Sequence, residues 1–529
     1  MQKKYTIRLK PAEAAGSHTI VNHLAALEGL PASCITGFYI LKRSIDARSR
    51  QPWVNLTVMA TLNEPFIDRT DVPFHFQDVT AAQQRVVIVG AGPAGLFAAL
   101  ELLQHGIKPV ILERGKDVRQ RRRDLAILNK EGLINPESNY CFGEGGAGTY
   151  SDGKLYTRST KRGDVSRVLH YLVRFGADET ILYEAHPHIG TNKLPGIITA
   201  MREHIIACGG EVHFEEKLTD IDIRDGKITA ALTAKGNRHE ADAFILATGH
   251  SARDIYQLLH QKNIQVEAKP FALGVRVEHP QALIDQIQYH CPVRDPWLPP
   301  ASYSLVEQVQ GKGVFSFCMC PGGIIAPAAT SPGELVVNGW SPSKRNNAFA
   351  NSGMVVEVNV NDVINSGIRK FFPALRTDPS DPLLLMRFQQ HVEEAAFSAG
   401  GGKFVAPAQR MTDFTSGRKS VNLPTCSYPP GINSSDLNEV LPPFIHERLR
   451  EGFIAFGKKM KGYHSGEALV VATESRTSSP VRIPRTNTFH HPQITNLFPC
   501  GEGAGYAGGI VSAAMDGERL ALAIAVQYK

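Results

Sequence analysis

The chain has 529 residues and a formal net charge of +6, and its 43% hydrophobic and 20% charged residues are ordinary for a globular protein of about two to four domains. No window approaches the roughly 20 consecutive apolar residues of a membrane-spanning helix, and the basic start lacks an apolar signal core, which argues against membrane insertion and export. Eight cysteines without paired metal-ligand spacing fit a cytoplasmic protein with no metal site, and the mild positive charge permits an anionic partner without requiring nucleic acid.

A small α+β unit is predicted for residues 1–80. Its elements are, in chain order, a strand at 5–9, a helix at 17–30 with Ser17 as N-cap, and strands at 37–45 and 53–62. The stretch 63–84, with its prolines and aspartates, is predicted to be a linker to a different kind of domain.

A strand, a glycine-rich turn and a helix begin at residue 85. The β-branched run 85–89 predicts a buried parallel strand, and a helix at 96–105 and a second strand at 109–112 follow. Gly90 permits the tight turn, Gly92 lets the backbone approach a pyrophosphate, and Gly95 lets helix and strand pack closely.

Glu113 ends the second strand, 23 residues after Gly90, where a carboxylate can accept the adenosine ribose hydroxyls of a dinucleotide. The pattern therefore predicts a dinucleotide-binding fold, but it does not distinguish FAD from NAD.

Two later segments favour FAD. After a predicted strand at 211–214 and a β-meander at 218–234, the apolar strand 243–249 ends in an Ala-Thr-Gly turn that resembles the pyrophosphate-contacting turn of glutathione-reductase-type FAD enzymes. The segment 496–503 resembles the second FAD motif of that fold, with Glu502 where an aspartate is more usual. This resemblance implies that Glu502 binds the ribityl chain and that a helix after Gly508 and Gly509 stabilises negative charge on the reduced flavin.

The chain as a whole resembles an uncharacterised bacterial group labelled NAD(FAD)-utilising dehydrogenases or FAD-dependent proteins. The matching segments are 139–155, 247–254, 273–279, 317–323, 408–414 and 474–482. The resemblance implies an α/β protein with a discontinuous glutathione-reductase-type FAD-binding Rossmann domain, an inserted α+β substrate domain and the small N-terminal α+β domain. The predicted boundaries are 1–80 for the N-terminal domain, 84–261 and 466–529 for the two parts of the FAD domain, and 262–465 for the substrate domain.

The predicted FAD site draws on all of these motifs and on the glycine-rich loop 145–154. Its predicted residues are Gly90, Ala91, Gly92, Pro93, Ala94, Gly95, Glu113, Arg114, Gly146, Asp152, Leu218, Thr248, Gly249, Gly501, Glu502, Gly508, Gly509 and Ile510.

Four residues are candidates for catalysis: Cys318, Cys320, His250 and Arg476. On a strand, Cys318 and Cys320 would share a face and point at the flavin as a redox relay or nucleophile, or else be inert packing residues, as Cys141 and Cys500 are expected to be. His250 suits a general acid, but it also suits a phosphate contact or a helix cap.

Arg276, Arg410 and Arg476 could clamp an anionic substrate, or serve structural roles. The arginine-rich run 119–123 is predicted to form a solvated helical face.

No second strand-linked Gly-x-Gly-x-x-Gly occurs, so any NADH or NADPH reductant would have to bind transiently at the flavin. The predicted function is an FAD-dependent oxidoreductase that acts on a small, anionic molecule. The alternatives are a flavin-dependent modifier of an RNA base, suggested by the basic segment 41–48, and a non-enzymatic redox-sensing flavoprotein. The oligomeric state and the substrate are left open.

Overall fold

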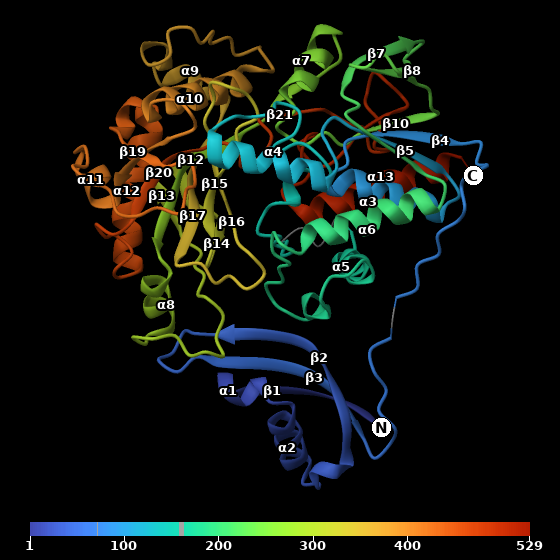
Figure 1. Ribbon diagram of the computed structural model, residues 1–529, viewed down its shortest axis with the longest axis vertical. Helices are drawn as coiled ribbons and strands as arrows, with labels where there is room; N and C mark the ends of the chain where they lie inside the picture. Colours follow the sequence, from blue (N-terminus) through green and yellow to red (C-terminus); the bar gives the residue numbers. More distant parts are fainter. Residues whose placement is uncertain (71, 158–162, 529) are drawn as a thin grey trace.

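The computed structural model describes residues 1–70, 72–157 and 163–528, and it places the predicted glycine-rich turn at the carboxyl end of the central strand of a five-stranded parallel sheet (Figure 1). In spatial order its strands are β22 (Leu497–Pro499), β10 (Ala243–Leu246), β4 (Arg85–Val89), β5 (Lys108–Glu113) and β6 (Glu211–Phe214). Every pairing is parallel, including that of β22 with β10, whose residues lie far apart in the sequence. Segments from both ends of the chain therefore build one α/β Rossmann-like fold.

The alternation of side chains along β4 explains why both faces of this sheet are covered. Val86 and Ile88 pack beneath four helices, whereas Val87 and Val89 pack on the opposite face against one helix and a β-meander. The four helices are α3 (Pro93–Gln104), α5 (Val165–Arg174), α6 (Leu194–Ala207) and α13 (Ile510–Gln527). The opposite face carries α7 (Arg253–Gln261), β7 (Leu218–Arg224), β8 (Lys227–Thr233) and β9 (Arg238–His239). No helix among the described residues has the length and apolar character needed to cross a bilayer.

Two carboxylates share one guanidinium where α13 packs against α3 and α5. Arg167 Nη2 lies 2.6 Å from Glu101 Oε2, and its Nε lies 3.2 Å from Glu518 Oε1. Burial, together with the neighbouring Glu101, raises the pKa of Glu518 to about 7. Because the folded state binds this proton more tightly than the unfolded state, the carboxyl favours folding below its ordinary pKa of 4.5 and loses that contribution as the pH rises through 7.

We therefore expect Glu518→Gln to flatten the pH dependence of stability. Relative to the wild type, the variant should gain about 1–3 kcal/mol between pH 5 and pH 8, measured by urea unfolding across that range. Glu203→Gln, at an exposed carboxylate of α6, is the control. Parallel pH profiles for wild type and Glu518→Gln would contradict the assignment.

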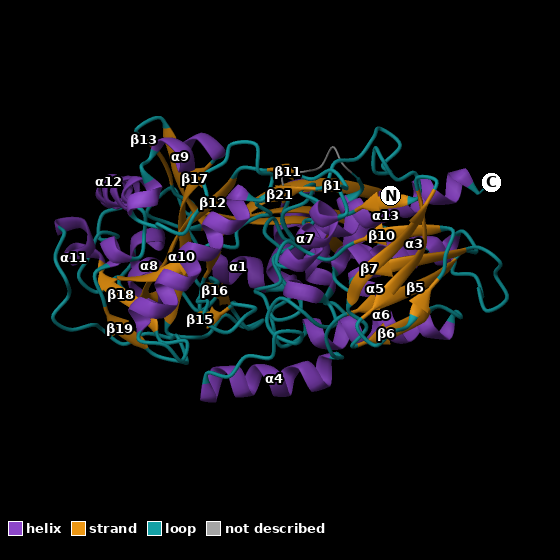
Figure 2. Cartoon of the chain, turned by 90° about the horizontal axis from the view of Figure 1, so that it is seen from above, coloured by secondary structure: helices purple, strands orange, loops and turns teal. Residues whose placement is uncertain are grey.

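A second sheet of seven strands, almost all antiparallel, lies beside the first (Figure 2). In spatial order its strands are β13 (Val306–Val309), β14 (Lys312–Cys320), β17 (Phe349–Val358), β12 (Phe271–Pro280), β20 (Leu469–Glu474), β18 (Ala406–Arg410) and β19 (Ile432–Ser434). Its helices are α8 (Gln281–Tyr289), α9 (Val360–Asn365), α10 (Leu384–Gly400), α11 (Met411–Ser416) and α12 (Pro443–Lys459), and a hairpin of β15 (Ile324–Pro327) and β16 (Val337–Trp340) lies beside it. Because β20 pairs with β12 and β18, this sheet continues past the predicted boundary at residue 465.

The N-terminal unit is a three-stranded antiparallel sheet with two helices on one face. Its elements are β1 (Gln2–Leu9), α1 (Pro11–Ala15), α2 (Ser17–Glu28), β2 (Ile35–Asp46) and β3 (Trp53–Leu62), in the spatial order β1-β3-β2. The predicted N-cap at Ser17 is wrong, because Ser17 is already helical and Gly16 takes the cap position. The basic strand β2 is covered at its outer edge, where the Arg43 backbone N–H donates to Tyr183 and the Arg43 carbonyl accepts from Ala185.

The predicted solvated face of the arginine-rich run is wrong in part. The run lies on α4 (Val118–Glu131), at the outside of the molecule in Figure 2, and Arg122 and Arg123 are exposed. Arg121, however, is fully buried and donates to the backbone carbonyls of Asn139, Tyr140, Gly143 and Glu144. It therefore organises the loop that precedes the glycine-rich segment at 145–154.

Candidate active site

A large cavity opens at the carboxyl ends of the parallel strands, between the two sheets. Its volume of about 1170 Å³ exceeds the roughly 300–1,000 Å³ of a typical single-ligand pocket. In open α/β folds, ligands bind in the crevice outside the carboxyl ends of the strands. All predicted FAD-binding residues line this cavity except Ala91, Gly95 and Gly501, and so do the four predicted catalytic residues.

The three glycines of the first turn have different surroundings. A Cβ on Gly90, whose φ is +110°, would collide with the Ala247 carbonyl, and a Cβ on Gly95 would collide with the Gly90 carbonyl. A Cβ on Gly92 would meet only the Gly146 Cα, at 3.9 Å. Gly90 and Gly95 are therefore needed for packing, whereas Gly92 leaves space open to the cavity.

Glu113 and Arg114 lie in the wall beside this turn. The Glu113 carboxylate accepts from three backbone N–H groups, those of Ala91 at 2.9 Å, Gly115 at 2.8 Å and Gly143 at 3.0 Å. Arg114 forms ion pairs with carboxylates on both sides and lies over the Phe142 ring, with 4.0 Å between the guanidinium carbon and the ring centroid. Glu113 thus joins three loops of the site, and both side chains reach the cavity surface.

The Ala-Thr-Gly turn after β10 contributes a buried hydroxyl group to the site. Thr248 Oγ1 is buried and has no hydrogen-bond partner among the described residues. The φ of Gly249 is +72°, and a Cβ there would point into open space. A Cβ on Gly503 would lie 2.6 Å from the Gly249 carbonyl oxygen, so the turn of the C-terminal motif packs directly against the Ala-Thr-Gly turn.

The starts of α3 and α13 meet at the cavity. A Cβ built on Gly148 would lie 3.5 Å from Pro93 Cγ, at the start of α3, and 3.3 Å from Ile510 Cγ1, at the start of α13. Deeper in the fold, a Cβ on Gly517 would collide with the Ala94 carbonyl, so the two helices cross in close contact. Two helix N-termini therefore direct their free N–H groups toward one cavity.

These features fit FAD. The cavity is larger than one small ligand requires, the Gly92, Gly249, Gly508 and Gly509 positions leave open space, and no described residue forms a hydrogen bond with the Thr248 hydroxyl. Helix N-termini suit a diphosphate because their N–H groups and dipoles favour negative charge.

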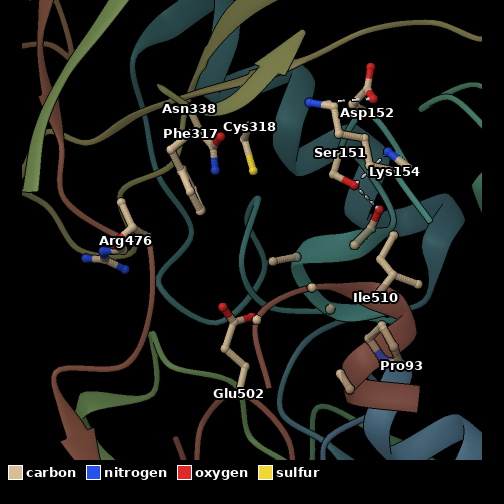
Figure 3. A pocket seen from close by; sticks show the side chains of 18 of the residues that line it. Pro93, Ser151, Asp152, Lys154, Phe317, Cys318, Asn338, Arg476, Glu502 and Ile510 are labelled. Carbon is tan, nitrogen blue, oxygen red and sulfur yellow. Dashed lines mark hydrogen bonds and ion pairs between the residues drawn. The ribbon is translucent and has the colours of Figure 1, made fainter. Parts of the chain in front are cut away.

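The second sheet and the β15–β16 hairpin supply the opposite wall, where Phe317, Cys318 and Asn338 face Ser151, Lys154 and Ile510 (Figure 3). The pairing of β14 with β17 shifts register between Phe317 and Cys320, and Cys318 has a φ of +46°. The expectation that the two cysteines share one face of a regular strand is therefore wrong: Cys318 is exposed at the cavity surface, and Cys320 is buried.

Both thiols are surrounded by fixed charges. Cys320 Sγ lies 3.4 Å from Arg276 Nη2 and 3.8 Å from Lys154 Nζ. Burial nevertheless raises the pKa of Cys320, and the exposed Cys318 is protonated at pH 7 because a free thiol has a pKa of about 8.5. Both cysteines are therefore neutral thiols at pH 7 in this arrangement.

The three arginines predicted as anion clamps have partners of their own. Arg276 is fully buried against Glu474, with 2.9 Å between Nη1 and Oε2, and Arg410 donates to Asn422 and to the Gly466 carbonyl. Arg476 reaches the cavity, but its guanidinium is held by Glu334 and Glu393 at 3.1 and 2.9 Å.

His250 and Asp152 also have partners inside the protein. His250 Nδ1 lies 3.4 Å from Glu502 Oε1, which joins the Ala-Thr-Gly turn to the C-terminal motif. Asp152 accepts from the Ser341 hydroxyl and from Arg345 Nη2. The sequence had not singled out Lys154 and Arg345, which both line the cavity next to Asp152: Lys154 only ended a glycine-rich loop, and nothing in the sequence pointed to Arg345.

Comparisons with known proteins agree with this architecture. Residues 84–255 match the family described as pyridine nucleotide-disulphide oxidoreductase, residues 270–477 match the family described as FAD-dependent protein, C-terminal domain-like, and residues 1–61 match a domain of unknown function. An uncharacterised protein of Clostridium beijerinckii is 41% identical over 500 residues, which cover 91% of each chain.

Solved structures give only distant similarity. Glycine oxidase from Bacillus cereus matches 84% of this chain and 96% of its own at 12% identity, with a TM-score of 0.31. The 2,6-dihydroxypyridine-3-hydroxylase of Arthrobacter nicotinovorans matches 84% of each chain at 10% identity, with a TM-score of 0.36. At these TM-scores neither similarity carries a conclusion about this protein.

Proposed function

The chain belongs to a family of uncharacterised FAD-dependent proteins and is an FAD-dependent oxidoreductase, and from this premise we propose that it transfers a hydride between FAD and a small anionic substrate held between its two large sheets. The observation that carries the proposal is the composition of the cavity. One wall contains the glycine turns and the two helix starts, and the other contains the bulged end of β14 from the second sheet. A cofactor on the first wall would leave room for a substrate against the second.

FAD, when bound, supplies the hydride or electron-pair transfer, and the protein binds and orients it. We assign the diphosphate to the turn around Gly92 and to the start of α3, and the adenosine ribose to Glu113. Thr248 would donate its free hydroxyl hydrogen to the cofactor. The start of α13, after Gly508 and Gly509, would stabilise negative charge on the reduced flavin.

We further propose that the cofactor-binding fold is of the glutathione-reductase type. The Ala-Thr-Gly turn after β10 packs against the C-terminal motif, which is the relation expected if both contact one extended dinucleotide. A division into the four predicted segments remains our proposal for the domain organisation, with the substrate segment 262–465 extended to include β20 of the second sheet.

Proton transfer is proposed for His250, which lines the cavity and is oriented by Glu502. Cys318 and Cys320 enter the proposal as neutral thiols, which donate weak hydrogen bonds but are poor nucleophiles. Arg476 is proposed as a positioning residue, because it is held by two carboxylates.

Anaerobic mixing of the FAD-loaded protein with NADH and with NADPH tests this function. We expect one of the two nucleotides to bleach the visible flavin absorption in a concentration-dependent manner. A nucleotide deuterated at the transferred position should slow the reaction, because the C–H bond breaks in hydride transfer. A screen of small carboxylic acids and carbonyl compounds for reoxidation would then identify the second substrate. Reduction no faster than in buffer without nucleotide would contradict a nicotinamide-linked reaction.

A further inference from the structure

Two cations share one carboxylate in the cavity wall nearest the start of α13. Arg345 Nη2 lies 2.9 Å from Asp152 Oδ2, and Lys154 Nζ lies 3.9 Å from the same oxygen. All three residues line the cavity. They come from different parts of the fold, because Asp152 and Lys154 belong to the loop that follows Gly148 and Arg345 belongs to the loop between β16 and β17.

Neither cation has its hydrogen-bonding capacity filled by the described residues. Arg345 Nε is buried and has no hydrogen-bond partner in the described part of the chain, and one other nitrogen of its guanidinium donates to Asp152. Among the described residues, the Lys154 ammonium contacts Asp152 at 3.9 Å and Cys320 Sγ at 3.8 Å, and thiol sulfur is a weak acceptor. Lys154 is also one-third exposed to the cavity, so its ammonium can reach a ligand.

Among the described residues, the charged groups that meet at Asp152 leave one positive charge over. The cations are Lys154 and Arg345, and the one carboxylate between them is Asp152, whereas the nearby buried Arg276 is paired with Glu474. Two neighbouring ionisable groups are uncharged at pH 7: burial raises the pKa of Cys320, and it lowers the pKa of His188 to about 4.

We propose that Lys154 and Arg345 form a binding site for one carboxylate group of the substrate. The proposal rests on the proposed function, since it assigns the substrate class of that same cavity. A carboxylate brings one negative charge and balances the local excess, whereas a phosphate dianion would leave a net negative charge in a partly buried site. The planar guanidinium and the ammonium can each donate to one carboxylate oxygen. The substrate is therefore a small monocarboxylic acid whose reacting carbon is held toward the start of α13.

Titration of the FAD-loaded protein with benzoate and with benzamide, at constant ionic strength, tests the site. The two probes have the same shape, but only benzoate is charged, and binding is followed by the shift of the visible flavin spectrum. We expect benzoate to bind about tenfold more tightly than benzamide. Lys154→Met should remove that preference, leave benzamide binding unchanged, and be rescued by Lys154→Arg.

Lys461→Met is the matched control, because Lys461 is an exposed lysine that lines the same cavity and forms no ion pair with any described residue. An equal loss of benzoate binding in Lys461→Met would show general attraction by the cavity charge and would overturn the proposal. Equal binding of benzoate and benzamide by wild-type protein would also overturn it. Each sample is first assayed for FAD content and for reduction by nicotinamide nucleotide. Absence of FAD contradicts the proposed function and absence of reduction contradicts its nicotinamide-linked form, whereas loss of charge discrimination in protein that passes both assays contradicts only the carboxylate site.

Discussion

Replacing Gly92 with valine is expected to abolish FAD binding while leaving the protein folded. Gly92 has φ −78° and ψ −177°, which any residue can adopt, and a Cβ there would meet nothing closer than the Gly146 Cα at 3.9 Å. The added side chain would therefore enter the cavity, where the diphosphate is proposed to lie against the α3 N-terminus. We expect FAD affinity to fall on the order of 100-fold or more, measured by fluorescence of released flavin and by isothermal titration of the apoprotein.

Two further variants separate this effect from misfolding. Gly196→Val places the same side chain on an exposed position of α6 with open space around it, and it should retain both fold and FAD. Gly95→Val should fail differently, because its side chain would collide with the Gly90 carbonyl and disrupt the packing of α3 on β4. If Gly92→Val binds FAD as tightly as wild type does, the diphosphate does not lie on this turn.

The dinucleotide-binding half could be predicted because its determinants are local. Strand, glycine turn, helix and second strand follow one another between residues 85 and 113, and each glycine has a steric reason that the structure reproduces. Even there the helix begins at Pro93 rather than at 96, since the turn residues themselves enter the first helical turn.

The strand order of the second sheet and the partners of its charged side chains could not be predicted in this way. Its strand order places β12 between β17 and β20, which lie about 70 and 190 residues further along the chain, and no short sequence pattern encodes such pairings. The same reason hides the partners of individual side chains. Arg121 and Arg476 are ordinary arginines in the sequence, and only tertiary packing shows that both are buried. A strand pattern also predicted that Cys318 and Cys320 share a face, because a bulge cannot be recognised from a Cys-Met-Cys sequence alone.

Replacing Arg476 with methionine is expected to cause a large loss of stability. Its guanidinium contacts Glu393 at 2.9 Å and Glu334 at 3.1 Å, and Arg253 of α7 pairs with the same two glutamates at 2.8 and 2.9 Å. This cluster of two arginines and two glutamates joins the FAD-binding half to α10 of the second half. Without Arg476, two buried carboxylates would share one cation, which should cost about 3–5 kcal/mol in urea unfolding.

The loss should depend on pH with a definite sign. Burial and the nearby Glu393 already raise the pKa of Glu334 to about 7. Burial also acts to raise the pKa of Glu393, but the attraction of Arg253 and Arg476 outweighs this effect and lowers the pKa overall. Removing Arg476 raises both pKa values in the folded state, so the variant loses stability relative to wild type as the pH rises from 5 to 8. Arg48→Met, which removes an exposed ion pair with Asp46, is the control and should change the stability little at either pH.

The double variant Arg476→Met/Glu393→Met separates the positioning role from a direct role in substrate binding. It removes one charge of each sign, so it should be more stable than the sum of the two single variants predicts. A residue that only clamped substrate would show the opposite pattern: Arg476→Met would raise KM and leave the unfolding midpoint unchanged. Because each side chain of the cluster is held by at least two others, we expect the midpoint to fall first, and any change in turnover to follow from displacement of the cavity wall that Arg476 supports.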